Sequence, residues 1–186
     1  MQERYEEAAQ ALSVLVSLYP DDAGAHDELA SAYYNLAQLD KAITELHEVL
    51  RLNPYSLAAY GKLVVYLARD NADDDAIAAF REANQRRLES PELHWGLGMA
   101  YFGQGKVDQA REEFRRLAGG GEPFRDLGQL YLSMVDLYEG RLAAAKTQIE
   151  ARIKADEPAH GTGLQLFRRY LLGRIYLFLE IGRAHV

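Results

Sequence analysis

Residues 23–56 read AGAHDELASAYYNLAQLDKAITELHEVLRLNPYS, and this stretch decides the fold because its features return every 34 residues. A column of alanines stands at that spacing, each followed four positions later by a large apolar residue. Its members are Ala8, Ala42, Ala76 and Ala110. The columns that contain Leu29 and Tyr33 keep the same spacing. A register held at several columns indicates stacked copies of one structural unit, since chance amphipathic helices would not keep it.

Each unit is predicted to be a pair of antiparallel helices. Small residues such as Ala30 and Gly98 let two helices approach closely, and Tyr33 and Tyr101 are expected to fill the wedge between neighbouring hairpins. Gly105 is expected in the turn between two helices, at positive φ. A helix with apolar residues every three or four positions cannot bury them alone, so the hairpins must stack. The sequence therefore predicts an all-α protein.

These columns resemble the tetratricopeptide repeat family, whose pattern runs aromatic, Leu-Gly, Tyr, Ala, Phe and Pro. The first whole repeat carries it at His26, Leu29, Ala30, Tyr33, Ala42, Leu46 and Pro54. The second carries it at Tyr60, Leu63, Val64, Leu67, Ala76 and Phe80. The third carries it at His94, Leu97, Gly98, Tyr101, Ala110 and Phe114. The resemblance implies a right-handed α-solenoid of stacked antiparallel helical hairpins.

The register divides the chain into repeats of unequal quality. A fourth repeat is degenerate, because Asp136 stands where tyrosine is expected, and the Gly119–Gly121 loop absorbs one extra residue. The predicted parts are the second helix of a truncated repeat (1–22), repeats 1 to 3 (23–56, 57–90 and 91–122), repeat 4 (123–157), the first helix of an incomplete repeat 5 (163–180) and a non-native tail (181–186).

The array thus begins and ends in mid-repeat, and we expect a fragment of a longer, bacterial protein. The closing residues, from Glu180 to Val186, look like the read-through translation of a common sequencing adapter. The alternative is a native helix end at Gly182 followed by a disordered tail. Helices at the two ends would lack stacking partners, so we expect end-to-end self-association. The residues expected to carry it are Leu12, Val16 and Leu18 at one end and Leu172 and Phe178 at the other.

Composition narrows the classes of partner. The formal net charge is −7, with 28 acidic and 21 basic side chains and no basic cluster, so nucleic acid is not expected. There is no cysteine, which excludes disulfides and thiolate metal sites. The longest apolar stretch, Leu171 to Leu179, is interrupted by Gly173 and Arg174, so no membrane span is predicted. The charged opening after Met1 indicates the cytoplasm if Met1 is the true start.

Two histidine patterns in the sequence have features of metal sites, but neither is predicted to bind a metal. His47-Glu48 begins like a zinc-protease helix, but Arg51 occupies the place of the second histidine, and the motif fails. His26 and His94 fall on the aromatic column of the repeat and are interpreted as partly buried packing residues.

Acidic and glycine-rich segments also have a structural interpretation. Asp73, Asp74 and Asp75 are expected at a helix start, where negative charge complements the helix dipole. The glycine loop at 119–121 and the segment 161–163 lack the Lys-Ser/Thr ending of a phosphate loop. We predict no catalytic residue, no metal, no cofactor and no enzymatic activity.

In the family, the first helix of each hairpin lines a concave groove, and the resemblance implies the positions that face a partner. They are Asp27, Ser31, Tyr34, Asn35, Val65, Arg69, Trp95, Met99, Phe102, Leu130, Met134, Leu137 and Tyr138. The groove is expected to be polar at one end and apolar at the other. Chaperone-tail-binding members use lysine and asparagine where this chain has Asp27 and Ser31, so that function is not expected. The apolar residues either anchor a partner or pack against the chain's own helices.

The function expected from this pattern is that of a protein–protein interaction scaffold. Its partner would be a protein or peptide, with a peptide segment or a helix of the partner held in the groove. The alternative is a sensing or scaffolding arm of a larger bacterial signalling protein, either a kinase or a transcriptional regulator.

Overall fold

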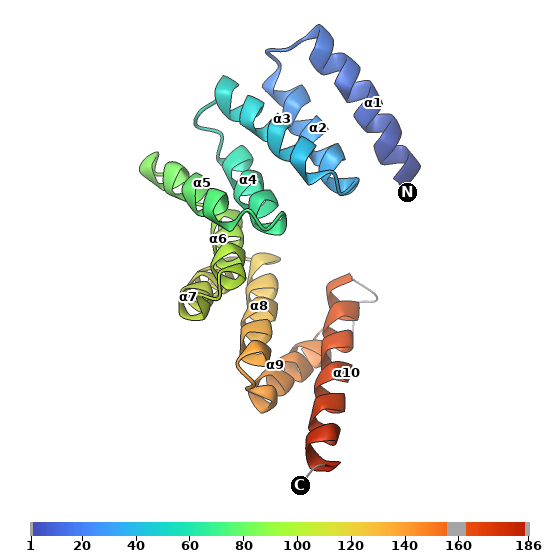
Figure 1. The fold of residues 1–186 in the computed structure, drawn as a ribbon, viewed down its shortest axis with the longest axis vertical. Coiled ribbons are helices and arrows are strands. Elements are labelled where there is room, and N and C mark those ends of the chain that lie inside the picture. Colours follow the sequence, from blue (N-terminus) through green and yellow to red (C-terminus); the bar gives the residue numbers. More distant parts are fainter. Residues whose placement is uncertain (1, 156–162, 185–186) are drawn as a thin grey trace. The chain divides into compact units, whose positions relative to one another are not determined.

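The computed structural model describes residues 2–155 and 163–184, with side chains for 2–155 and 164–177. Over these ranges all regular structure is α-helix, in ten helices, as predicted. Figure 1 shows the helices in chain order, from α1 to α10. The helices are α1 (Gln2–Leu18), α2 (Ala23–Asn35), α3 (Leu39–Leu52), α4 (Leu57–Arg69), α5 (Asp73–Gln85), α6 (Pro91–Gly103), α7 (Val107–Ala118), α8 (Phe124–Tyr138), α9 (Leu142–Ala155) and α10 (Gly163–Ala184).

The chain forms two compact units, Met1–Leu117 and Ala118–Val186, called here the first and the second unit. The division of the chain into repeats stays a prediction, although each expected hairpin range holds two helices. α10 continues to Ala184, which places residues 181–184 of the predicted tail within a helix. The expected loop at 156–162, the side chain of Phe178 and the last two residues lie outside what is described.

Three first helices begin at capping residues that stand 34 positions apart. The Asp22 carboxylate accepts hydrogen bonds from the backbone N–H groups of Gly24 (2.9 Å) and Ala25 (3.1 Å). Ser56 and Ser90 cap α4 and α6 in the same way, accepting from backbone N–H groups three residues later. Each cap satisfies amide donors that the first turn of a helix leaves unpaired. The starts of the hairpins are therefore fixed locally by the sequence.

The turns inside the hairpins repeat at the same period. Gly105 has φ 70°, as predicted, and the equivalent residues Ala37 and Asn71 have φ 57° and 60°. Glycine adopts this left-handed conformation without cost, whereas a Cβ atom makes it strained by about 1 kcal/mol or more. Ala37 therefore holds a conformation that its own side chain disfavours, because stacking of the flanking helices requires it.

The core of the first unit is built from the columns read in the sequence. Ala42, Ala76 and Ala110 have no exposed surface, and Leu46 and Phe114 are equally buried. Tyr33 packs against the cluster of α1 and α2 and also against the cluster formed with α3 and α4. Its hydroxyl lies 3.2 Å from Ser13 Oγ on α1. The predicted role of Tyr33 between neighbouring hairpins is confirmed.

Two glycines allow α6 to lie close to two other helices. A Cβ atom on Gly98 would lie 2.5 Å from the ring of Phe114 on α7, within the same hairpin. A Cβ atom on Gly96 would lie 2.7 Å from the backbone of Val64 on α4. Real Cβ atoms do not approach other atoms this closely. Close approach at Gly98 agrees with the prediction, whereas Gly96 was not anticipated.

A buried acidic residue replaces the expected tyrosine in the second unit. Asp136 is 6% exposed, and Arg141 donates two hydrogen bonds to its Oδ1 atom (3.1 and 2.6 Å). Gln148 on α9 donates to Oδ2 at 3.0 Å. Asp126 on α8 likewise pairs with Arg152 of α9 and Arg168 of α10. Polar networks thus join helices of the second unit, in addition to its apolar cluster of Ala145, Ile149 and Ile175.

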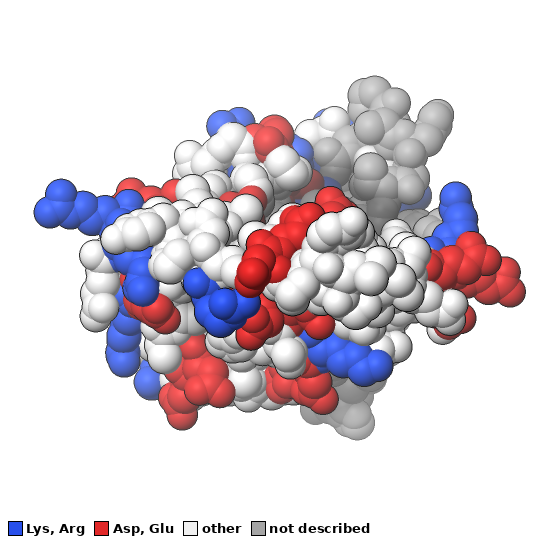
Figure 2. All heavy atoms as spheres, turned by 90° about the horizontal axis from the view of Figure 1, so that it is seen from above, with Lys and Arg blue, Asp and Glu red and all other residues white. Residues whose placement is uncertain are grey.

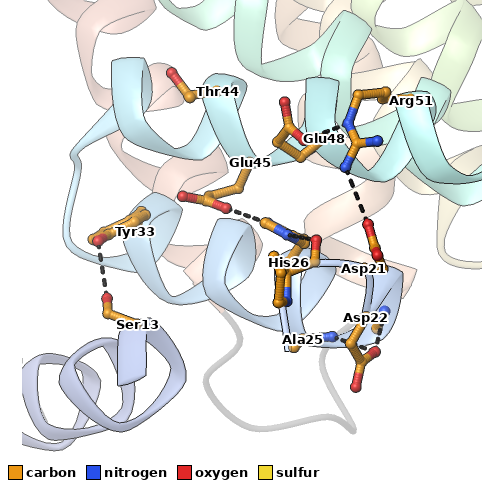
Figure 3. A network of polar contacts seen from close by, with 12 residues as sticks. Ser13, Asp21, Asp22, Ala25, His26, Tyr33, Thr44, Glu45, Glu48 and Arg51 are labelled. Atoms are coloured by element: carbon orange, nitrogen blue, oxygen red, sulfur yellow. Dashed lines mark hydrogen bonds and ion pairs between the residues drawn. The ribbon is translucent and has the colours of Figure 1, made fainter. Parts of the chain in front are cut away.

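Buried histidine–glutamate pairs join the two helices of two hairpins. His26 Nδ1 lies 2.6 Å from Glu45 Oε2, and His94 Nδ1 lies 2.7 Å from Glu113 Oε2, at the same spacing of 19 residues. His26 Nε2 lies 3.1 Å from the carbonyl oxygen of Pro20 (Figure 3). Burial acts to lower the pKa of His26, but the hydrogen bonds and the charges of Glu45 and Glu48 outweigh it, so the pKa is raised. These histidines are packing residues that also form ion pairs when protonated.

The turn geometry predicts that Ala37→Gly stabilises the protein. Removing the Cβ atom relieves the left-handed strain, and we expect the free energy of unfolding to rise by roughly 0.5–1 kcal/mol. Gly105→Ala is the matched control and should lower it by a similar amount. Urea denaturation followed by circular dichroism measures both, and a destabilised Ala37→Gly protein would contradict the account.

Close helix approach predicts different outcomes at two neighbouring glycines. Gly96→Ala should destabilise by about 1–3 kcal/mol, because the backbone of Val64 cannot move aside. Gly98→Ala should also lower the free energy of unfolding. A second substitution, Phe114→Leu, should recover most of this loss, because the pair then matches Ala30 and Leu46 in the first whole hairpin. A double-mutant cycle by urea denaturation tests the coupling, and additive effects at Gly98 and Phe114 would refute it.

The His26 pair predicts a dependence of stability on pH. The pKa is raised in the folded state, so the stabilisation is fully present below the unfolded-state pKa of 6.5 and is lost as pH rises through the folded-state value. The difference in unfolding free energy between wild type and His26→Gln should therefore be largest below the unfolded-state pKa and shrink as pH rises above it. The exposed His47→Gln variant is the control. A difference that stays constant with pH would disprove the linkage.

Candidate protein-binding groove

The first helices of the first unit, α2, α4 and α6, line a hollow of about 710 Å³. Aromatic and aliphatic side chains dominate its surface, with a few polar groups between them. The lining residues are Tyr34, Leu57, Ala58, Gly61, Lys62, Val65, Tyr66, Ser90, Glu92 and Trp95. Its volume and its mixed lining are typical of sites that bind peptides or small molecules.

Two stacked tyrosines form one wall of the hollow. The rings of Tyr34 on α2 and Tyr66 on α4 lie 4.1 Å apart between centroids, with 8° between their planes. The Arg69 guanidinium lies 5.0 Å from the centroid of Tyr34 and donates a hydrogen bond to its hydroxyl. Burial, reinforced by Tyr34 and Asp27, raises the pKa of Tyr66 to about 12. Tyr66 therefore stays a neutral hydroxyl at physiological pH. Ring stacking and the Arg69 guanidinium hold Tyr34 in place.

An ion pair closes the polar part of the hollow. Lys62 Nζ lies 2.9 and 2.8 Å from the two carboxylate oxygens of Asp27 and 3.0 Å from Ser31 Oγ. Both charged side chains are about one-third exposed, at 31% each. The ammonium group is therefore already neutralised by the protein's own carboxylate, and the polar end holds a satisfied network.

The α6 side supplies large apolar groups. Trp95, Met99 and Phe102 are all half-buried. Trp95 and Met99 pack partly against the main core, and Trp95 also lines the hollow. Trp95 therefore packs against the core with part of its surface and lines the hollow with another part.

A single-sign charged patch, a membrane-spanning helix or a metal cluster would each indicate another class of ligand. Figure 2 shows acidic and basic side chains interspersed with uncharged atoms on the face in view. Among the residues that the structure describes, no helix is long and apolar enough to cross a membrane. Within the same residues, no three side chains of the metal-binding types come together.

The zinc-protease-like motif and the aspartate cluster singled out in the sequence make contacts within the fold. Arg51, at the failed zinc-protease motif, donates to Glu48 at 2.7 Å and lies 3.6 Å from Asp21 (Figure 3). Asp73, Asp74 and Asp75 occupy the first turn of α5. Burial and the charge of Asp74 raise the pKa of the Asp73 carboxyl.

Sequence comparison identifies the repeats. Two models described as tetratricopeptide repeat match residues 1–65 and 74–123, more than half of the chain together. The chain belongs to the tetratricopeptide repeat family. No curated protein sequence matches the chain significantly.

Solved tetratricopeptide repeat structures share the fold. One from Parabacteroides merdae has a TM-score of 0.78 at 20% identity, covering 96% of this chain and 67% of that one. A thermophilic protein from Thermus thermophilus has a TM-score of 0.72 at 22% identity, covering 94% and 92%. YrrB, a tetratricopeptide repeat protein with an unusual peptide-binding site, has a TM-score of 0.59 at 21% identity, covering 93% and 86%.

The structure brings together some of the groove residues that the family resemblance implied. Tyr34, Val65 and Trp95 line one hollow, with Asp27, Ser31 and Arg69 bonded to its lining residues. Asn35 is exposed at the end of α2, where its amide donates to the Ser31 carbonyl oxygen at 2.7 Å.

Burial limits the surface that other predicted groove residues can offer to a partner. Val65 is only 4% exposed and Leu130 only 5%, so they contribute packing more than contact surface. Leu130, Met134, Leu137 and Tyr138 belong to α8 in the second unit, where Leu137 packs against the core and Tyr138 is 65% exposed.

Sequence reasoning missed Lys62 and Tyr66. Lys62 is the one lysine in α2, α4 and α6, and it follows its partner Asp27 by 35 residues, as Arg69 follows Tyr34. A search for complementary residues one repeat plus one position apart would have found Lys62, but it would not have found Tyr66, which stacks on Tyr34 at a spacing of 32 residues.

Proposed function

We propose that the first unit is a scaffold whose groove binds an extended or helical segment of a partner protein. The observation that supports this proposal is the hollow between α2, α4 and α6, which is lined by Trp95 and by the stacked pair of Tyr34 and Tyr66. Large aromatic side chains around a partly desolvated pocket are the groups that supply most binding energy at protein interfaces. The tetratricopeptide repeat fold is one that serves protein–protein interaction.

The chemistry of the hollow favours an apolar anchor over a terminal carboxylate. Lys62, the lysine that lines the hollow, is held by both oxygens of Asp27, so capture of a carboxylate would require breaking that pair. Glu92 lines the same hollow and favours a cation beside the anchor. We infer that the partner segment carries a large apolar side chain next to a lysine or arginine. The peptide-binding site of YrrB, on the same fold, supports this use of the groove.

The sole tryptophan of the chain makes a direct test available. Trp95 is the only tryptophan, so its fluorescence reports the groove without labelling. Peptides selected from a random phage-displayed library against the 186-residue chain should shift the Trp95 emission to the blue as they cover its ring. The selected sequences should share an apolar residue beside a basic one.

Alanine substitutions in the hollow test whether the selected peptides bind there. Trp95→Ala and Tyr34→Ala should each weaken the selected peptides at least tenfold, because both side chains line the hollow and anchor residues contribute about 1.4 kcal/mol or more. Tyr55→Ala is the matched control, because Tyr55 is 69% exposed and lies outside the hollow. Calorimetric titration gives the affinities, and circular dichroism checks that helicity is kept. Peptides that bind both alanine variants as tightly as wild type would refute the groove.

A further inference from the structure

The end helices offer less free surface than the sequence indicated. Leu12 and Val16 pack within the cluster that joins α1 and α2, and Leu172 packs within the cluster of α9 and α10. Leu18 is 67% exposed. Of the residues expected to carry self-association, Leu12, Val16 and Leu172 are therefore engaged within the chain.

A second hollow, of about 700 Å³, lies on the other side of α4 from the groove. α3 and α5 form its two walls, and α4 supplies its floor through Tyr60, Leu63 and Leu67. At about 3.6 residues per turn, this floor is on the opposite side of α4 from Gly61 and Val65, which line the groove. The first unit thus has two hollows that share one helix and no lining residue.

The second hollow arises from the particular sequence of its hairpin. In the first and third hairpins Glu45 and Glu113 stand at the position of Ala79, and each pairs with the histidine of the aromatic column. The second hairpin has Tyr60 in place of that histidine, and the Tyr60 hydroxyl donates a hydrogen bond to Glu82, one turn beyond Ala79. The space that a glutamate takes in the other two hairpins is therefore left to the hollow, which Ala79 lines.

The shape of the second hollow fits a helix. Its lining runs from Tyr60 to Leu67 on α4 and from Asp75 to Arg86 on α5, which makes a trough about 10–16 Å long, or two to three helical turns. Half-buried Ile43 and Leu50 on α3 and exposed Ala78 on α5 supply apolar surface that a ligand can reach. A trough between two helices accepts the apolar face of a third, with contacts every three or four residues.

The charges around the second hollow leave one carboxylate unsatisfied. Glu82 pairs with Arg86 at 2.9 Å, and Arg51 on the opposite wall pairs with Glu48 at 2.7 Å. Asp75 is exposed in the first turn of α5, and within the described residues it has no hydrogen bond or ion pair. A basic group of a ligand would therefore gain an ion pair at Asp75, whereas an acidic group would be repelled.

We propose that the second hollow binds an amphipathic helix of a partner protein, with a lysine or arginine beside its apolar face. Apolar side chains of that helix contact Ile43, Leu50 and Ala78, and its basic side chain pairs with Asp75. The proposal does not depend on the groove, because no residue lines both hollows. One chain then holds two partner segments on opposite sides of α4 without competition between them.

A differential selection tests the proposal. Ala78→Arg blocks the second hollow, since the long side chain covers the apolar surface and pairs with Asp75 on the same face of α5. The equivalent positions hold Thr44 and Glu112, so a longer side chain is compatible with the fold. A phage-displayed library of helical peptides without tryptophan is depleted on the Ala78→Arg chain and then selected on the wild-type 186-residue chain. The retained peptides should combine an apolar stripe with a basic residue beside it.

Calorimetric titration of the retained peptides tests the ion pair. Asp75→Asn should weaken them about two- to fivefold, the range of a solvent-exposed ion pair. Asp108→Asn is the matched control, because Asp108 is an exposed aspartate in the first turn of α7 and does not line the second hollow. The emission of Trp95, which lines the groove, should not change on binding, whereas a peptide in the groove would shift it.

Four results would overturn the proposal. One is a selection that yields no peptide able to distinguish wild type from Ala78→Arg, and another is a set of retained peptides with acidic residues in place of basic ones. An effect of Asp75→Asn no larger than that of Asp108→Asn would reject the ion pair. A blue shift of Trp95 on binding would place the peptides in the groove and not in the second hollow.

Discussion

Backbone contact between α4 and α6 is the constraint from which the groove follows. At Gly96 the two helices are so close that one added carbon would overlap the Val64 backbone. The residue before this contact is Trp95, which is therefore placed over the hollow beside Val65, and Gly98 two residues later receives Phe114 from α7. A short Gly-Leu-Gly segment thus sets the spacing of a neighbouring helix on either side of α6 and positions the largest aromatic side chain of the groove.

The periodic features were predictable because they depend on local contacts. The alanine column, the Tyr33 wedge and the turn at Gly105 each follow from residues within one hairpin or its neighbour. The Lys62 pair with Asp27 was not predicted, since it depends on the angle between successive hairpins, which a repeat period does not specify. At Asp136 the sequence indicated a defect, and the structure instead has a satisfied polar network. Val65 and Leu130 are more buried than their repeat positions implied.

The groove and the buried columns of the repeat use different residues. The groove is lined by side chains that vary from repeat to repeat, so its chemistry is particular to this chain. The alanine column at Ala42, Ala76 and Ala110 is instead the same in each hairpin and has no exposed surface. The chemistry of the groove can therefore change while the residues that hold each hairpin together stay the same.

The regular spacing of caps and turns has an evolutionary consequence. Asp22, Ser56 and Ser90 stand 34 residues apart, as do the left-handed residues Ala37, Asn71 and Gly105. A recombination event between two caps would therefore remove or duplicate one complete cassette and leave every junction with its capping residue and turn intact. The length of such a groove can change by gene duplication alone, without any new loop or any new core contact having to be selected.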